Sequence, residues 1–96
     1  MANFDKTPSA ELDYTVDWTN WLDSSANEQL NTSVWDISGD GQLEKMTDFQ
    51  TDYKTQILLR GGTIGRRYTV RNIISTKNAS FSRKDSRSFT VIVGLK

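Results

Sequence analysis

Short segments in which apolar and polar residues alternate recur along the chain, and this is the pattern of β-strands with one buried face. The clearest is residues 68–76, where Tyr, Val, Asn and Ile fall on one side and Thr, Arg, Ile and Ser on the other. Segments of this kind cover residues 12–18, 30–37, 42–48, 51–59, 68–76 and 87–95. Gly, Asn, Asp and Ser separate them at close spacing. The pattern predicts an all-β sandwich of six to seven antiparallel strands.

The connection between two of these strands holds three glycines and is followed by a tyrosine; residues 57–76 read ILLRGGTIGRRYTVRNIIST. Gly61, Gly62 and Gly65 can take the positive φ that a tight crossing between strands needs. Tyr68 then stands where the tyrosine corner of an immunoglobulin-like β-sandwich would bond back to the backbone of residues 60–65. The alternative is an ordinary hairpin in which Tyr68 is only a core aromatic residue. The corner makes the predicted fold class an immunoglobulin-like sandwich.

Length and composition narrow the classes of function. The 96 residues fit a single β-sandwich domain, with residues 1–10 expected to form an N-terminal arm. The chain has no Cys and no His, so it lacks the commonest general base, the thiolate nucleophile and the commonest metal ligand. We therefore expect no enzymatic activity, no cofactor and no metal. With neither a secretion signal nor a bilayer-length apolar run, it is expected to be made in a cytoplasm and to avoid membranes.

The charges are distributed unevenly although they cancel overall. Residues 1–48 hold ten acids and two bases, and residues 49–96 hold ten bases and two acids. A free basic domain would suggest nucleic acid, but here both halves belong to one small fold, so nucleic-acid binding is not expected. The first interpretation is internal complementarity between the strands. The second is a polar molecule that docks its opposite ends on different neighbours.

Residues 36–47 resemble a calcium loop in part. They place oxygen ligands at loop positions one, three and five and Gly at position six, as an EF-hand does. Position twelve is Thr47, where a bidentate Glu is needed, and neither flank has a helical pattern. We interpret this segment as a Gly-rich turn between two strands.

Three tryptophans raise the question of a surface that stacks on sugar rings. Trp18, Trp21 and Trp35 are the only tryptophans in the chain, and a small sandwich needs large side chains to fill its core. We interpret them as core residues. Trp21, which lies in a bend after the first predicted strand, is the one candidate for a sugar platform.

A candidate docking surface follows from the alternation. If Tyr68, Val91 and their alternating neighbours face the core, Ile73 and Ile92 face outward and share one outer face with Arg71, because their strands are neighbours in an immunoglobulin-like order. Leu58 would point outward from the opposite sheet. Isoleucines beside an arginine are typical of interface anchors. The alternative is that a loop, or the N-terminal arm around Phe4, covers these residues within the monomer.

Four segments together resemble a bacteriophage family, the small fibre–tail adaptor proteins. They are LDYTVDWTNWL (12–22), SVWDI (33–37), LLRGGTIGRRYTVRNIIST (58–76) and RSFTVIV (87–93). The family pattern looks like L-D-Y-x-x-D-W-x-x-W-L, S-x-W, L-x-G-G-T-x-G-x-x-Y-x-V-x-N and R-S-F-x-I-x-V. The resemblance runs over most of the chain in the same order. Residues 39–56 depart from the pattern because they are more charged and poorer in Thr and Gly.

The resemblance implies a non-enzymatic structural protein of the virion tail, which attaches tail fibres to the tail through protein–protein contacts. The implied partners are the tail fibre protein and a tail tube, adaptor or nozzle protein of the same virion, with the chain present in multiple symmetric copies. No catalytic residue is implied. The matched positions have structural roles, and they are Trp18, Trp21, Trp35, Gly61, Gly62, Gly65, Tyr68 and Asn72. The alternative function is a small carbohydrate-binding module of a fibre that contacts host glycan.

Overall fold

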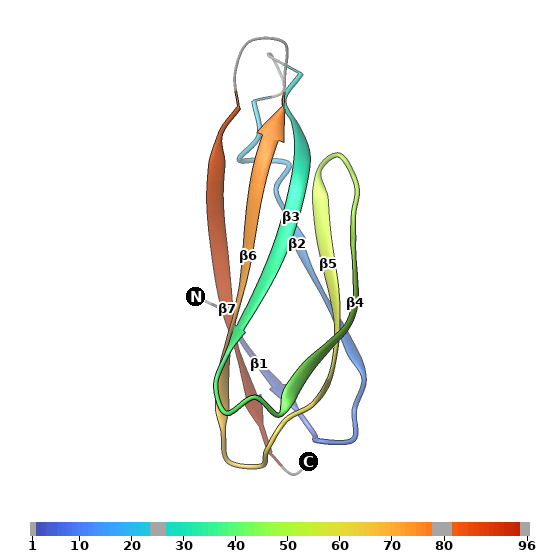
Figure 1. The fold of residues 1–96 in the computed structure, drawn as a ribbon, viewed down its shortest axis with the longest axis vertical. Coiled ribbons are helices and arrows are strands. Elements are labelled where there is room, and N and C mark those ends of the chain that lie inside the picture. Colours follow the sequence, from blue (N-terminus) through green and yellow to red (C-terminus); the bar gives the residue numbers. More distant parts are fainter. Residues whose placement is uncertain (1, 24–26, 78–81, 95–96) are drawn as a thin grey trace.

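The computed structural model describes residues 2–23, 27–77 and 82–94, and these form seven strands in two sheets (Figure 1). The strands are β1 (Ala2–Lys6), β2 (Leu12–Asp17), β3 (Gln29–Ser38), β4 (Leu43–Gln50), β5 (Lys54–Gly61), β6 (Arg67–Lys77) and β7 (Lys84–Val93). One sheet has the order β1-β7-β6-β3 and the other the order β2-β5-β4. Side chains from both sheets form one shared core. The predicted all-β sandwich is confirmed.

The strand order is that of an immunoglobulin-like sandwich. Strands β3, β6 and β7 correspond to C, F and G, and β2, β5 and β4 correspond to B, E and D. Each of the six strands expected from the alternation is present. The first strand, β1, was not predicted, and it pairs with β7 in parallel, whereas the other pairs among the described strands are antiparallel.

Strand β1 occupies half of the expected N-terminal arm and completes the core at the sheet edge. The Phe4 ring lies 5.1 Å from the ring of Tyr14 and 5.3 Å from that of Phe89, measured between centroids. Tyr14 belongs to the other sheet, so Phe4 helps to close the sandwich between β1 and β2. This packing explains why a five-residue segment with one large apolar side chain forms a strand.

The core is built from alternate residues of the inner faces, as the sequence predicts. Its larger cluster joins β2 to β7, and its members with no more than 1% exposure are Ile57, Leu59, Tyr68, Val70, Val91 and Val93. A second cluster lies at the other end of the sandwich, around Trp18 and Ile74. Trp35 is buried in the first cluster, while Trp21 packs against the second and is half-buried.

A buried amide joins the two sheets. Asn72 on β6 accepts hydrogen bonds from Trp18 Nε1 at 3.0 Å and from Thr55 Oγ1 at 2.6 Å, and both donors belong to the side of the three-stranded sheet. The Nδ2 group of Asn72 donates to Ser33 Oγ at 2.9 Å and to the Val34 carbonyl at 3.3 Å, on the neighbouring strand β3. Asn72 is fully buried. Because a buried amide must be satisfied internally, this network fixes how the sheets sit on each other.

Tyr68 makes the contact expected of a tyrosine corner. Its hydroxyl accepts a hydrogen bond from the backbone N–H of Thr63 at 2.9 Å and donates to Asp40 Oδ1 at 2.5 Å. The bond from Tyr68 is the main reason that the pKa of Asp40 is lowered. Gly61, Gly62 and Gly65 have φ of 82°, 100° and 86°, as the sequence predicts. A Cβ on Gly61 would lie 2.5 Å from the carbonyl oxygen of Gln42, so the close approach also requires glycine.

The topology explains the uneven charge. The first four strands are the four sheet edges, and the last three are the inner strands. The acidic half of the chain therefore lies at the edges and the basic half between them. Among the described residues five ion pairs form, and four of them join an acid from residues 1–48 to a base from residues 49–96. This pattern supports internal complementarity, and charged edges also discourage strands of other molecules from pairing there.

A buried ion pair closes the end of the sandwich opposite the tyrosine corner. The side chain of Glu28 is fully buried and accepts hydrogen bonds from the Asp23 backbone N–H, from Thr76 Oγ1 and from Arg83. The Arg83 guanidinium binds both carboxylate oxygens, donates to the Trp21 carbonyl and lies 4.1 Å from the Trp21 ring centroid. These bonds, led by those from Arg83, lower the pKa of Glu28 to about 2.

Substituting Tyr68→Phe is expected to destabilise the protein by about 1.5–3 kcal/mol, because it removes a hydrogen bond to a charged group and leaves the Thr63 N–H without its partner. Equilibrium chemical denaturation measures this. Tyr14→Phe is the matched control, since the buried Tyr14 hydroxyl has no hydrogen-bond partner among the described residues and its loss should change stability little. Equal stability of the two variants would show that the corner does not stabilise the fold.

Stability should fall as the pH is lowered from about 5 toward 2. The folded pKa of Glu28 lies below its unfolded value of 4.5, so its contribution is present above the unfolded value and is lost as the pH falls through about 2. Glu28→Gln should be less stable at neutral pH and show a flatter dependence. Glu44→Gln removes an exposed ion pair with Arg60 and should keep the slope of the wild type. A Glu28→Gln protein with the wild-type slope would contradict this account.

Candidate docking surfaces

The outer face of the four-stranded sheet carries an apolar pair. Val34 on β3 lies directly opposite Ile73 on β6, with Val34 56% exposed and Ile73 half-buried. One step along the same strands, Asp36 and Arg71 are opposite each other and form an ion pair at 3.6 Å. A shallow hollow of about 320 Å³ beside Ile73 is lined by Arg71, Ile73, Lys84, Asp85 and Ser86. This arrangement of an apolar centre with charged residues around it is the usual anatomy of a small protein interface.

The structure brings together only part of the predicted cluster. Ile73, Arg71 and Ile92 lie on the same outer face, but Ile92 is opposite Arg67 at the other end of β6. Arg67 is six residues from Ile73 along the strand, so Ile92 and Ile73 are separated by about 20 Å. The expected clustering of Ile92 with Ile73 is therefore wrong. Val34 takes its place, and its position next to the buried Trp35 in an alternating strand is the signal that could have revealed it.

Strand β1 does not lie over this apolar pair. Strand β1 extends the sheet beyond β7, with Asp5 opposite Ile92. The ring of Phe4 contacts Tyr14 and Phe89 of the core. The alternative that Phe4 covers Ile73 is thus contradicted by its contacts.

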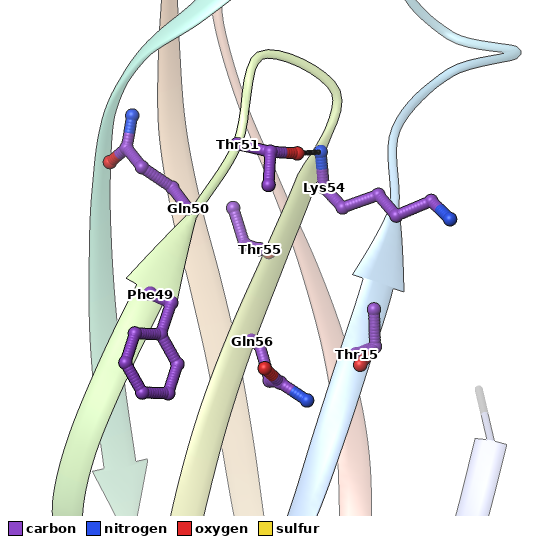
Figure 2. A pocket seen from close by; sticks show the side chains of 7 residues that line it. All are labelled: Thr15, Phe49, Gln50, Thr51, Lys54, Thr55 and Gln56. Atoms are coloured by element: carbon purple, nitrogen blue, oxygen red, sulfur yellow. Dashed lines mark hydrogen bonds between the residues drawn. The ribbon is translucent and has the colours of Figure 1, made fainter.

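The outer face of the three-stranded sheet offers a second surface. Leu58 lies on it and is half-buried between Asp13 and Thr47 of the neighbouring strands. One row further along, Thr15, Gln56 and Phe49 lie side by side on β2, β5 and β4 (Figure 2). They border a hollow of about 290 Å³ whose remaining lining residues are Gln50, Thr51, Lys54 and Thr55.

Phe49 is the most prominent residue on this second face. It is 58% exposed, the highest exposure among the large apolar side chains of the described residues. Sequence reasoning missed it because it lies in the charged segment 39–56, where the alternation is weak. An exposed aromatic ring surrounded by hydroxyl and amide groups is a surface that can pack against a neighbour and keep a polar rim.

The tryptophans are engaged within the protein. Trp18 is fully buried, and the guanidinium of Arg87 lies 4.3 Å from its ring centroid. Trp21 meets the edge of Trp18, with centroids 5.3 Å apart, and carries Arg83 over its ring. Because the Arg83 guanidinium covers a face of the Trp21 ring, the arrangement disfavours Trp21 as a surface that stacks on sugar rings.

Residues 36–47 comprise the end of β3, the turn at residues 39–42 and the first part of β4, and they are not a loop between helices. Asp40 accepts hydrogen bonds from Tyr68 and from the Gln42 backbone N–H at 3.1 Å, while Asp36 pairs with Arg71. Their oxygens thus have partners within the fold. In the described parts of the chain no group of three or more acidic residues is placed to hold a metal ion.

Residues 6–92 match the model of the Gp77 family, whose description is "Podophage GP4 fiber-tail adaptor protein gp77". The match contains β2 to β6 completely and β7 except for its last residue, so it includes both outer faces described above. No curated protein and no solved structure matches the chain. None of the described residues forms a helix long and apolar enough to cross a membrane.

Neighbouring isoleucines on β6 provide a test of which side chains point outward. Ile73→Asp should leave the domain folded and cost about 1 kcal/mol, because Ile73 lies on the outer face. Ile74→Asp should unfold the domain, since Ile74 is 1% exposed and the introduced carboxylate would be buried in an apolar cluster. Circular dichroism and thermal denaturation distinguish the two. Unfolding of Ile73→Asp would show that Ile73 is structural.

Proposed function

The chain belongs to the podophage fibre–tail adaptor family, and on this basis we propose that it joins tail fibres to the tail by docking the outer faces of its two sheets on neighbouring proteins. The observation that carries the proposal is the family match over residues 6–92. The role is structural. It also agrees with a sequence that contains neither His nor Cys.

The arrangement of polar contacts supports this role. The buried groups of Asn72, Tyr68 and Glu28 find their partners inside the sandwich. The two outer faces keep exposed apolar side chains, Val34 beside Ile73 on one and Phe49 on the other. Because the faces of a sandwich point in opposite directions, an adaptor of this shape can hold two neighbours at once. An apolar centre with a polar rim is what such contacts require.

The proposed partners are the tail fibre protein on one side and a tail tube, adaptor or nozzle protein on the other. The chain would occupy the virion tail in multiple copies that follow the symmetry of the tail. Synthesis would take place in the host cytoplasm, before assembly. The border of the face around Val34 and Ile73 carries both signs of charge, Arg71 paired with Asp36 and Lys84 next to Asp85, so a neighbour with polar groups of both signs would suit it.

The proposal is tested in the phage that encodes the chain. Particles made without the protein should have tails that lack fibres, and the wild-type gene supplied in trans should restore them. Mass spectrometry of purified particles measures the fibre content. Particles that carry a full set of fibres without this protein would contradict the proposal.

Ile73→Asp, supplied in the same way, should reduce fibre content at least about tenfold although the domain folds. Asn27→Asp is the control, because it introduces the same charge at an exposed loop residue whose positive φ of 55° suits Asn and Asp. The control should restore fibres fully. Normal fibre content with Ile73→Asp would remove this face from the interface.

A further inference from the structure

The crossing between β5 and β6, residues 62–66, ends in a tight turn at one end of the sandwich (the lower end in Figure 1). The Arg66 N–H bonds to the Thr63 carbonyl at 3.1 Å, and Gly65 has a φ of 86°. This is a type II turn with glycine at its third position, where positive φ is required. Ile64 occupies the second position, at the tip of the crossing.

The backbone of the crossing is held by partners from three separate segments. The N–H groups of Gly62, Thr63 and Gly65 bond to the Gln42 carbonyl at 2.9 Å, the Tyr68 hydroxyl at 2.9 Å and the Val93 carbonyl at 2.8 Å. The Val93 N–H returns a bond of 3.0 Å to the Arg66 carbonyl. A turn fixed in this way loses little conformational entropy when a partner binds it.

Ile64 is not explained by the fold. It is 51% exposed and belongs to neither core cluster. The second position of a type II turn accepts most residues and favours proline, so the turn does not require an isoleucine. A single exposed apolar residue is ordinary on a surface, but this one stands at the end of a turn that the tyrosine corner keeps rigid.

Two arginines stand beside Ile64. The side chain of Arg66 is 67% exposed, and Arg67 is also exposed. The carboxylate of Asp40 lies 3.9 Å from Arg66 Nε and also accepts hydrogen bonds from Tyr68 and Gln42. The surroundings of Ile64 are therefore basic, and guanidinium groups bind carboxylates in a bidentate geometry.

We propose that the crossing is a preformed docking tip, in which Ile64 enters an apolar socket on a protein of the tail, and that the rim of this socket carries Asp or Glu side chains. The inference rests on the proposed adaptor function and names a contact of that function that the two sheet faces do not include. The apolar side chain supplies the anchor, the arginines supply orientation and rate of association, and the rigid turn removes the cost of ordering the loop.

The test uses fibreless tails purified from particles made without this protein, and it measures binding of the purified chain to them by biolayer interferometry. Ile64→Ser should weaken binding at least about tenfold while the thermal midpoint of unfolding stays at the wild-type value, because Ile64 lies outside the core. Tyr53→Ser is the matched control. Tyr53 is 46% exposed and comes just before β5, whereas the crossing comes just after β5. Tyr53 and the crossing therefore lie at opposite ends of this strand.

Arg67→Glu gives a second readout of the acidic rim. It should weaken binding more at low than at high salt, since the lost attraction is between exposed charges. If the wild-type protein binds the tails and both Ile64→Ser and Arg67→Glu bind them equally well, the docking tip is overturned but the adaptor function is not. Wild-type protein that fails to bind the tails would contradict the adaptor function and the tip together.

Discussion

The buried amide of Asn72 is the interaction on which the sandwich depends most. A side-chain amide can accept two hydrogen bonds and donate two, and Asn72 makes all four. The Oδ1 atom of Asn72 accepts from Trp18 and Thr55, and its Nδ2 group donates to β3. The contact therefore sets the position of the largest core side chain and the distance between the sheets. Trp18 in turn supports Trp21 and Arg87 at the surface.

Asn72 is the middle one of three polar anchors on the inner face of β6. Tyr68 lies four residues before it and holds the crossing and the β3–β4 turn. Thr76 lies four residues after it and donates to Glu28 at 2.8 Å, next to Arg83. Residues four apart on a strand point to the same side, so one strand fixes both ends and the middle of the sandwich. Since these contacts are made inside, the outer faces and the tip at Ile64 are available for other proteins.

Alternation in the sequence was enough to predict six strands and the inner and outer sides of β6 and β7, and the three glycines before Tyr68 predicted its role. These features depend on residues close together in the chain. Alternation was not enough to predict β1, whose five residues form a strand only because Phe4 packs against Tyr14 and Phe89.

The same limit applies to contacts between distant segments. Glu28 and Arg83 are 55 residues apart and each reads as an ordinary loop charge. The pairing of Val34 with Ile73, and the separation of Ile73 from Ile92, follow from strand register, which the alternation alone does not fix.

The central claim is that the polar contacts of this protein hold it together from the inside, while its outer surfaces hold fibre and tail together. A cryo-EM reconstruction of the intact tail tests it most directly. The account predicts that the chain lies between fibre and tail, with Val34 and Ile73 buried against a neighbour and the Asn72 network unchanged. A chain placed elsewhere in the particle, or one whose two outer faces are both open to solvent, would contradict it.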